Sequence, residues 1–251
     1  MPRYNFGARR LYVMAPLAQA ATINLDQTQA NYVRNVLRLP EGAKILVFNG
    51  LDGEWETSVS VSNRKLVALV VQKMMRQQTP KPGLQYLFAP LKHARQDYMV
   101  EKAVEMGAGL LRPVLTRRTQ ITRINSDRMR AHAIEAAEQC GILSIADIAP
   151  AIRLDALVAA WEKDRLLVFC DEIAPLHDPY EILRSCRSPA IPRKLAVLIG
   201  PEGGFDQSER ETLLRLPHVV RLPLGPRVLR ADTAAVAALA LIQAALGDWH
   251  E

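Results

Sequence analysis

The sequence predicts an α/β protein with a parallel sheet, preceded by a smaller β-rich domain. Three observations support this. After residue 83, continuous apolar runs alternate with helix-like segments, as in parallel sheets covered on both faces. Before residue 75, the chain has short strand-like runs instead. Between them, the polar stretch QKMMRQQTPKPG at 72–83 contains two prolines and a glycine, which is typical of a linker.

The first domain, residues 1–75, is predicted to be a small β-barrel or sandwich carrying one helix. Asn-Gly and Asp-Gly pairs at 49–50 and 52–53 predict a hairpin. The segment 26–39 has helical spacing of apolar residues, and Asp26 is a suitable N-cap. The expected strands are 10–14, 44–48, 54–61 and 65–72.

The second domain, residues 76–251, is predicted to be the parallel α/β domain. Its expected strands are 84–90, 109–115, 165–170, 194–200 and 219–224. Its expected helices are 92–107, 126–141, 154–161, 178–186, 205–216 and 230–246. Gly107 is placed to end the first of these helices.

Composition indicates a basic protein of a reducing compartment. The formal net charge is +6, which favours an acidic partner such as nucleic acid. Three cysteines, odd in number and without a CxxC pair, disfavour a disulfide scaffold and a structural zinc site. The apolar stretch 234–246 is shorter than the ~20 residues that cross a bilayer. We therefore expect a cytoplasmic protein with no membrane segment.

An apolar strand ends in the glycine-rich loop LIGPEGGF, residues 198–205. Glycines at this density suggest that a ligand approaches the backbone closely. A P-loop is excluded because no Lys-Ser/Thr pair follows Gly204, and the Rossmann spacing is not met. An ordinary turn remains the alternative.

A second apolar strand also ends in a glycine loop, LGPRVLRADTA, residues 224–234. Asp232 or Thr233 is able to cap the helix that follows. Two such loops at the ends of neighbouring parallel strands would form one pocket lined by main-chain N–H and C=O groups, suited to an adenine edge.

These two motifs together closely resemble the signature of the SPOUT class of RNA methyltransferases, and more narrowly the ribosomal RNA small subunit methyltransferase E family. The resemblance extends over nearly the whole chain. It includes NYVRNVLRLPEGAKILVFNG, which is similar to that family's PUA-like barrel, and the middle blocks EKAVEMGAGLLRPVLTRRT and AIEAAEQCG.

The resemblance implies a fold, a reaction and partners. The fold would be a PUA-like β-barrel followed by a SPOUT domain, whose C-terminal strands and loops form a trefoil knot. The reaction would be S-adenosylmethionine-dependent methylation of N3 of a uridine in 16S rRNA, within the 30S ribosomal subunit. The protein would be a homodimer.

Two positions depart from the family pattern. Asp232 stands where the family usually has glutamate, so its carboxylate lies one methylene further back. After the EQCG block, the family usually shows Gly-Arg, whereas residues 142–146 here contain no arginine.

The resemblance and the chemistry of the two loops assign candidate site residues. Methylation at N3 needs a proton acceptor and a cation for the uracil anion, and we expect Asp232 and Arg230 in these roles. For Asp232, helix capping remains the alternative. Glu202 is able to bond the ribose or a neighbouring loop. Further pocket candidates are Asp171, Glu172, Glu138 and Gln139. The expected cofactor-binding residues are Leu198, Gly200, Pro201, Glu202, Gly203, Gly204, Leu222, Leu224, Gly225, Val228, Leu229, Thr233 and Ala234.

Basic residues in both domains are candidates for phosphate contacts. They are Arg9, Arg10, Arg34, Arg38, Lys92, Arg95, Arg117, Arg118 and Arg123. The five histidines are scattered without ligand spacing, so the sequence predicts no metal site.

Two other functions remain open. The same fold is able to methylate another RNA, for example a transfer-RNA ribose. A protein with the barrel and an inactive knot would bind RNA without catalysis.

Overall fold

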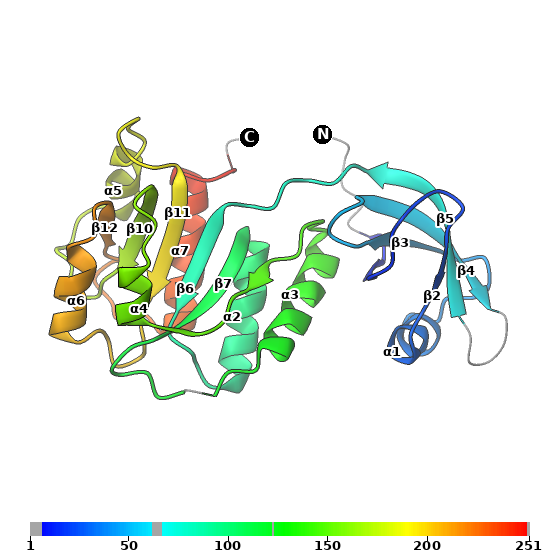
Figure 1. The fold of residues 1–251 in the computed structure, drawn as a ribbon, viewed down its shortest axis with the longest axis horizontal. Helices are drawn as coiled ribbons and strands as arrows, with labels where there is room; N and C mark the ends of the chain where they lie inside the picture. Colours follow the sequence, from blue (N-terminus) through cyan, green and yellow to red (C-terminus); the bar gives the residue numbers. More distant parts are fainter. Residues whose placement is uncertain (1–6, 62–66, 122, 250–251) are drawn as a thin grey trace. The chain divides into compact units, whose positions relative to one another are not determined.

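The computed structural model describes residues 7–61, 67–121 and 123–249, which form two compact units (Figure 1). The first unit comprises Met1–Lys81 and Ile134–Ile145. The second comprises Pro82–Ala133 and Ala146–Glu251. The chain therefore returns to the first unit after it has entered the second.

The first unit is built on a curled five-stranded sheet with the strand order β1-β3-β4-β5-β2. Strand β1 pairs in parallel with β3, and the other pairs are antiparallel. The predicted β3–β4 hairpin is confirmed, because Asn49 Oδ1 accepts hydrogen bonds from the backbone N–H groups of Leu51 and Asp52 in the connecting turn. The strands are β1 (Arg10–Tyr12), β2 (Thr22–Asn24), β3 (Lys44–Phe48), β4 (Glu54–Val61) and β5 (Val67–Arg76).

The helical segment of this unit has two parts. Helix α1 (Gln27–Asn31) begins at Asp26, the predicted N-cap, whose carboxylate accepts a hydrogen bond from Gln29 N. The chain then widens into the π-helix η1 (Tyr32–Val36), where Leu37 N donates to Tyr32 O at 2.9 Å. The prediction of one regular helix over 26–39 is therefore wrong in its second half.

Two apolar clusters and one charged cluster stabilise the first unit. The larger apolar cluster lies between the curled sheet and the helical segment, and it includes Ile23, Val33 and Val47. The smaller one joins Phe48 to Leu143 and other residues of the returning segment Ile134–Ile145. The charged cluster is the buried Glu54 carboxylate, which accepts hydrogen bonds from Arg10 and Arg76.

The second unit contains a parallel sheet with the order β12-β10-β11-β6-β7-β8, and β9 also pairs with β7 (Figure 1). The predicted parallel sheet is confirmed, since every pairing in this sheet is parallel. The strands are β6 (Leu84–Phe88), β7 (Ala108–Leu115), β8 (Asp147–Ile148), β9 (Ile152–Arg153), β10 (Arg165–Cys170), β11 (Lys194–Ile199) and β12 (Val219–Leu222).

Helices cover this sheet. On one face, Leu87, Phe169 and Leu198 pack against residues of α4 and α6. The alternating residues Tyr86 and Phe88 point to the opposite face, where their rings stack 5.0 Å apart. Helix α7 packs on β11, α2 and α5. The helices are α2 (His93–Glu105), α3 (Ser126–Cys140), α4 (Leu154–Ala159), α5 (Pro179–Ser185), α6 (Gln207–Leu214) and α7 (Ala231–Ala245).

Several predicted boundaries differ from the structure. Strand β5 continues to Arg76 and takes up the first residues of the predicted linker, while residues 65 and 66 of the predicted strand 65–72 lie outside the described residues. Strands β2, β8 and β9 were not predicted, because two or three residues are too few for a pattern.

Strand β10 lies between β11 and β12, so the chain crosses back over β10 to add its last strand. As a result, the carboxyl ends of β10, β11 and β12 are neighbours at one edge of the sheet.

Candidate active site

A cavity of about 610 Å³ lies at the carboxyl ends of β10, β11 and β12. This is the edge at which open parallel sheets bind ligands, and the volume suits a small molecule. Three chain segments line the cavity. They supply Cys170, Asp171, Glu172, Ala174 and Leu176; Ile199, Gly200, Pro201, Glu202, Gly203 and Gly204; and Leu222, Pro223, Leu224, Gly225, Pro226, Arg227, Val228, Leu229, Arg230, Ala231 and Ala234.

The loop after β11 passes very close to other groups. A Cβ at Gly200 would overlap the ring of Phe205, which itself packs edge-on against Phe169 at 5.0 Å. Gly204 N donates to Pro201 O at 2.9 Å and closes the turn. Gly204 has φ +68°, which is the left-handed region. Glycine is therefore required at these positions by the packing of the loop itself.

The loop after β12 is more exposed. Val228 is 93% exposed, and Arg227 and Arg230 are exposed beside it. Arg230 is the N-cap residue of α7, so the expectation that Asp232 or Thr233 caps this helix is wrong. Asp232 lies inside the first turn, where its Oδ1 accepts a hydrogen bond from Thr233 N and lies 4.0 Å from Arg230 Nε.

A buried ionic cluster joins the loop after β10 to helix α6 and strand β12. The Asp171 side chain has no exposed surface. Its Oδ1 accepts from Arg210 Nε at 3.0 Å, and its Oδ2 accepts from Arg221 Nε at 2.8 Å. Arg210 also donates to Glu172 Oε1 at 3.2 Å. Because both oxygens of Asp171 are occupied, its role is to fix the loop rather than to bind a ligand.

Basic side chains hold the outer side of the loop after β11. Arg95 of α2 is hydrogen-bonded to Glu202. Arg118 Nη1 donates to Gly203 O at 2.7 Å, and Arg117 Nη1 donates to Asp206 Oδ1 at 3.1 Å. Three of the predicted phosphate-binding residues thus gather around one loop of the pocket.

The predicted cofactor-binding residues are mostly brought together. Leu198 does not line the cavity, because it belongs to the core beneath it, and Thr233 is exposed outside it. Glu138 and Gln139 are not among the lining residues either; Glu138 Oε1 accepts from Tyr12 N in the first unit. The remaining predicted residues line the cavity: Gly200, Pro201, Glu202, Gly203, Gly204, Leu222, Leu224, Gly225, Val228, Leu229 and Ala234.

The predicted RNA-binding residue Arg10 differs from the other basic candidates. It is 5% exposed and paired with Glu54 inside the first unit. We therefore assign it a structural role, because a buried guanidinium with a carboxylate partner is not available to a phosphate.

One residue of the pocket lining is a buried thiol. Burial raises the pKa of the Cys170 thiol, so this residue is a neutral, apolar part of the lining. Outside the cavity lining, burial also raises the pKa of Tyr86 of β6, whose hydroxyl has no hydrogen-bond partner among the described residues.

Sequence reasoning missed Arg210 and Arg221, the two partners of Asp171. The available signal was weak: Arg210 lies three residues before Leu213, which places it on the buried side of α6. A charged residue at a buried helix position implies a buried partner, but the sequence does not say which one.

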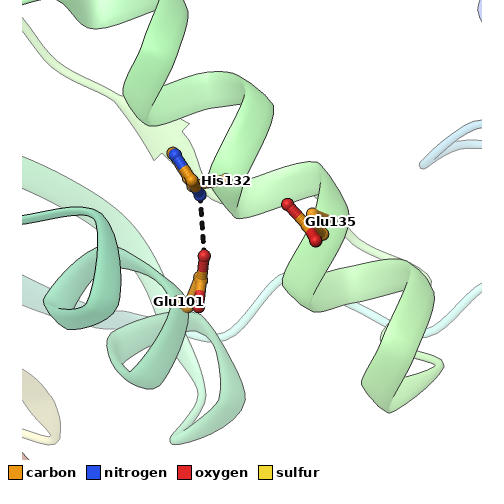
Figure 2. A group of neighbouring side chains, drawn as sticks. All are labelled: Glu101, His132 and Glu135. Carbon is orange, nitrogen blue, oxygen red and sulfur yellow. Dashed lines mark hydrogen bonds and ion pairs between the residues drawn. The ribbon is translucent and has the colours of Figure 1, made fainter. Parts of the chain in front are cut away.

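A second cluster of ionisable side chains lies on α2 and α3. Figure 2 shows His132 of α3 hydrogen-bonded through Nδ1 to Glu101 of α2 at 2.7 Å. Asp97 lies 3.4 Å from the same ring and also pairs with Arg128. These contacts connect the two helices.

The fold and the pocket define a SPOUT-class α/β domain, in which loops at the ends of neighbouring parallel strands form a ligand pocket. Residues 78–243 match the family model described as RNA methyltransferase domain, and residues 25–72 match the RNA methyltransferase PUA domain. The chain belongs to this RNA methyltransferase family.

Curated relatives and solved structures match over nearly the whole chain. Ribosomal RNA small subunit methyltransferase E of Rickettsia conorii is 28% identical over 237 residues, which cover 93% of this chain and 94% of the relative. The Bacillus subtilis protein of the same name is 25% identical over 236 residues, 90% and 91% of the two chains. A methyltransferase structure from Legionella pneumophila, with bound S-adenosylmethionine, aligns with a TM-score of 0.82 at 26% identity and covers 95% and 98%.

The predicted fold class is confirmed by these matches: a SPOUT α/β-knot methyltransferase domain with a parallel sheet, preceded by a small PUA-like domain. Among the described residues, no helix has the length and apolar character needed to cross a membrane.

Proposed function

We propose that this protein methylates N3 of a uridine in 16S rRNA of the small ribosomal subunit, using S-adenosylmethionine. The observation that carries the proposal is that both glycine motifs line one cavity in a chain of the RNA methyltransferase family. The curated relatives that act on small-subunit ribosomal RNA support this substrate.

The pocket fits the cofactor in size and chemistry. Main-chain groups of the two glycine loops suit the polar edge of adenine, and Leu224 and Leu229 supply apolar contacts for its faces. When bound, S-adenosylmethionine supplies an electrophilic methyl group. The residues that we propose to hold it are Gly200, Pro201, Glu202, Gly203, Gly204, Leu222, Leu224, Gly225, Val228, Leu229 and Ala234.

The chain's own chemistry would come from the start of α7. Uridine N3 becomes nucleophilic only when it loses its proton. We assign proton acceptance to the Asp232 carboxylate, whose side chain is only 13% exposed. Asp232 itself is not among the lining residues, but its chain neighbour Ala231 and Arg230 are. Arg230 lines the cavity with an exposed guanidinium, which suits it to stabilise the negative charge on uracil O2 and O4.

The two proposed domains would have different roles. The PUA-like domain, proposed as residues 1–75, would contact RNA through Arg9, Arg34 and Arg38. The SPOUT domain, proposed as residues 76–251, would add Lys92 and Arg123, together with Arg95, Arg117 and Arg118, which hold the loop after β11. These residues are exposed except Arg34, which is half-buried.

We also propose that the protein is a cytoplasmic homodimer. Three apolar side chains beside the pocket support this: Val228 is 93% exposed, Leu176 63% and Ile173 59%. Light scattering across a dilution series tests it, and a monomer at all concentrations would contradict it.

The test of function is methyl transfer to small ribosomal subunits from cells that lack this gene. Labelled S-adenosylmethionine is supplied, the RNA is digested, and the labelled nucleoside is identified. We expect N3-methyluridine at one site, and a large loss of the rate in Arg230→Ala and Asp232→Asn. A different labelled nucleoside would contradict the proposed substrate. The absence of transfer to any RNA would contradict the proposed methyltransferase activity.

A further inference from the structure

Glu172 is a pocket carboxylate with a fixed orientation and an available oxygen. Its Oε1 accepts a hydrogen bond from Arg210 Nη2 at 3.2 Å. Its side chain is 43% exposed and lines the cavity. Its Oε2 has no hydrogen-bond partner among the described residues. One oxygen is thus held while the other is able to accept a hydrogen bond from a ligand.

The orientation of Glu172 depends on a buried anchor. Arg210 is 8% exposed, and its Nε donates to Asp171, which is held a second time by Arg221. Glu172 also lies against the backbone of the loop after β11, because a Cβ at Gly204 would overlap its Oε1. The carboxylate is therefore placed by β10, α6 and the glycine loop together.

Glu202, the other carboxylate of the pocket, is placed differently. Its Oε1 is hydrogen-bonded to Arg95, outside the ionic cluster, and its side chain is 46% exposed. The sequence left two roles open for Glu202, a ribose contact or a bond to a neighbouring loop. Its hydrogen-bond partner is instead Arg95 of helix α2. Because this arginine occupies Oε1 of Glu202, the ribose is left without an assigned acceptor.

We propose that Glu172 binds the ribose hydroxyls of the cofactor, with Arg210 as its positioning residue. The inference rests on the proposed use of S-adenosylmethionine. A carboxylate is acceptor-only when ionised and matches a pair of neighbouring hydroxyl donors. Its place, against the glycine loop that would hold the adenosine, puts the acceptor beside the sugar rather than beside the reacting uridine.

The test compares ligands that differ only in the hydroxyls. Calorimetry measures the affinity of S-adenosylhomocysteine and of its 2′-deoxy and 3′-deoxy forms. The unaltered protein is expected to bind at least one deoxy form about tenfold more weakly, since a hydrogen bond to a charged group is lost. Glu172→Ala is expected to bind all three ligands alike. Equal discrimination in the unaltered protein and in Glu172→Ala would overturn the proposal.

Glu202→Ala is the comparison variant, because it removes a pocket carboxylate of similar exposure. Since Glu202 is among the residues proposed to hold the cofactor, any loss of affinity is expected to be equal for all three ligands, so that the discrimination between them is kept. Glu172→Gln conserves shape and guards against misfolding, and it is expected to lose most of the discrimination with an unchanged unfolding midpoint. Full discrimination in Glu172→Gln would contradict a role for the charge.

Arg210→Lys tests the positioning role. Loss of discrimination with a folded protein is expected, whereas retained discrimination with lower stability would make Arg210 merely structural. If the unaltered protein binds none of the three ligands, the proposed cofactor itself fails. That result is distinct from binding without discrimination, which overturns only the role of Glu172.

Discussion

Gly204 cannot carry a side chain for two independent reasons. Its φ of +68° is a conformation that costs an L-residue about 1–2 kcal/mol. A Cβ would also overlap the Glu172 carboxylate, which Arg210 prevents from moving freely. Gly203 next to it has neither restriction, since its added Cβ would meet the Arg118 side chain at an ordinary 3.6 Å. The two neighbours therefore offer a matched pair.

Gly204→Ala is expected to lower the free energy of unfolding by about 1–3 kcal/mol through backbone strain and displacement of Glu172. Gly203→Ala is expected to change it by less than about 0.5 kcal/mol. Urea unfolding of the two variants measures this. If both variants lose the same free energy of unfolding, neither the positive φ of residue 204 nor the displacement of Glu172 destabilises the loop.

Glu54 shows how a buried charge depends on its partners. Burial opposes its ionisation, but the hydrogen bonds from Arg76 and Arg10 outweigh that effect and lower its pKa below 4.5. A carboxylate whose pKa is lower in the folded state than in the unfolded state stabilises the protein fully at pH values above its unfolded-state pKa. This stabilisation is lost as the pH falls through the folded-state pKa. Exposed pairs such as Lys44–Glu56 have no comparable burial.

Glu54→Gln is expected to reduce the stability of the first unit by about 3–5 kcal/mol at neutral pH, because two arginines lose a buried partner. The difference from the unaltered protein should shrink as pH falls below 4.5. Glu56→Gln, the control, should cost less than about 1 kcal/mol. Denaturant unfolding across pH 3 to 7 provides the comparison, and a pH-independent difference would rule out the ionised carboxylate as the cause.

At the scale of elements, long periodic segments were predictable and short or irregular ones were not. The strands around Val168 and Val197 read as continuous apolar runs because helices cover both their faces. The π-helix at 32–36 left no such signal, since its extra residue per turn depends on tertiary packing. Likewise, both glycine loops were visible in the sequence, whereas the partners of Asp171 required knowing which helix and strand meet there.

Helix α6 begins directly after the glycine loop, so its N-terminus influences the pocket. Asp206 accepts a hydrogen bond from Ser208 N at 2.9 Å, and Glu209 accepts from Asp206 N, which completes a capping box. The same helix carries Arg210. Helix α1 begins with an equivalent capping box at Asp26, in the other unit.

Asp206→Ala and Asp26→Ala are each expected to cost about 1 kcal/mol of stability, since each removes an N-cap. Only Asp206→Ala should also weaken S-adenosylmethionine binding, because it loosens the turn that precedes Arg210. Calorimetry and urea unfolding on both variants separate the two effects. If Asp206→Ala binds S-adenosylmethionine with unchanged affinity, the start of α6 does not influence the pocket.

On the scale of the whole molecule, the net charge of +6 is carried in part by exposed arginines and lysines in both units. Arg38 and Arg123 are exposed and belong to different units. Lys163 is also exposed but precedes β10, at the end of that strand away from the cavity. Substituting each of these three residues therefore distinguishes the loss of a phosphate contact from the loss of one unit of net charge.

Arg38→Gln and Arg123→Gln are each expected to reduce the slope of log binding constant against log salt by about one, the loss of one phosphate contact. Lys163→Gln, the same change in net charge, should leave the slope unchanged. RNA binding measured between about 50 and 200 mM salt gives the slopes. Equal slopes for all three variants would mean that only net charge matters.

The return of Ile134–Ile145 to the first unit sets the order in which a nascent chain is able to fold. When residue 81 leaves the ribosome, Phe48 still lacks Ala137 and Leu143, and Arg76 still lacks its hydrogen bond to Gly141 O. An apolar face therefore stays uncovered until some sixty further residues have been translated. The N-terminal domain consequently exposes this apolar face during its own synthesis, and gene fragments that stop at residue 81 encode an incomplete core.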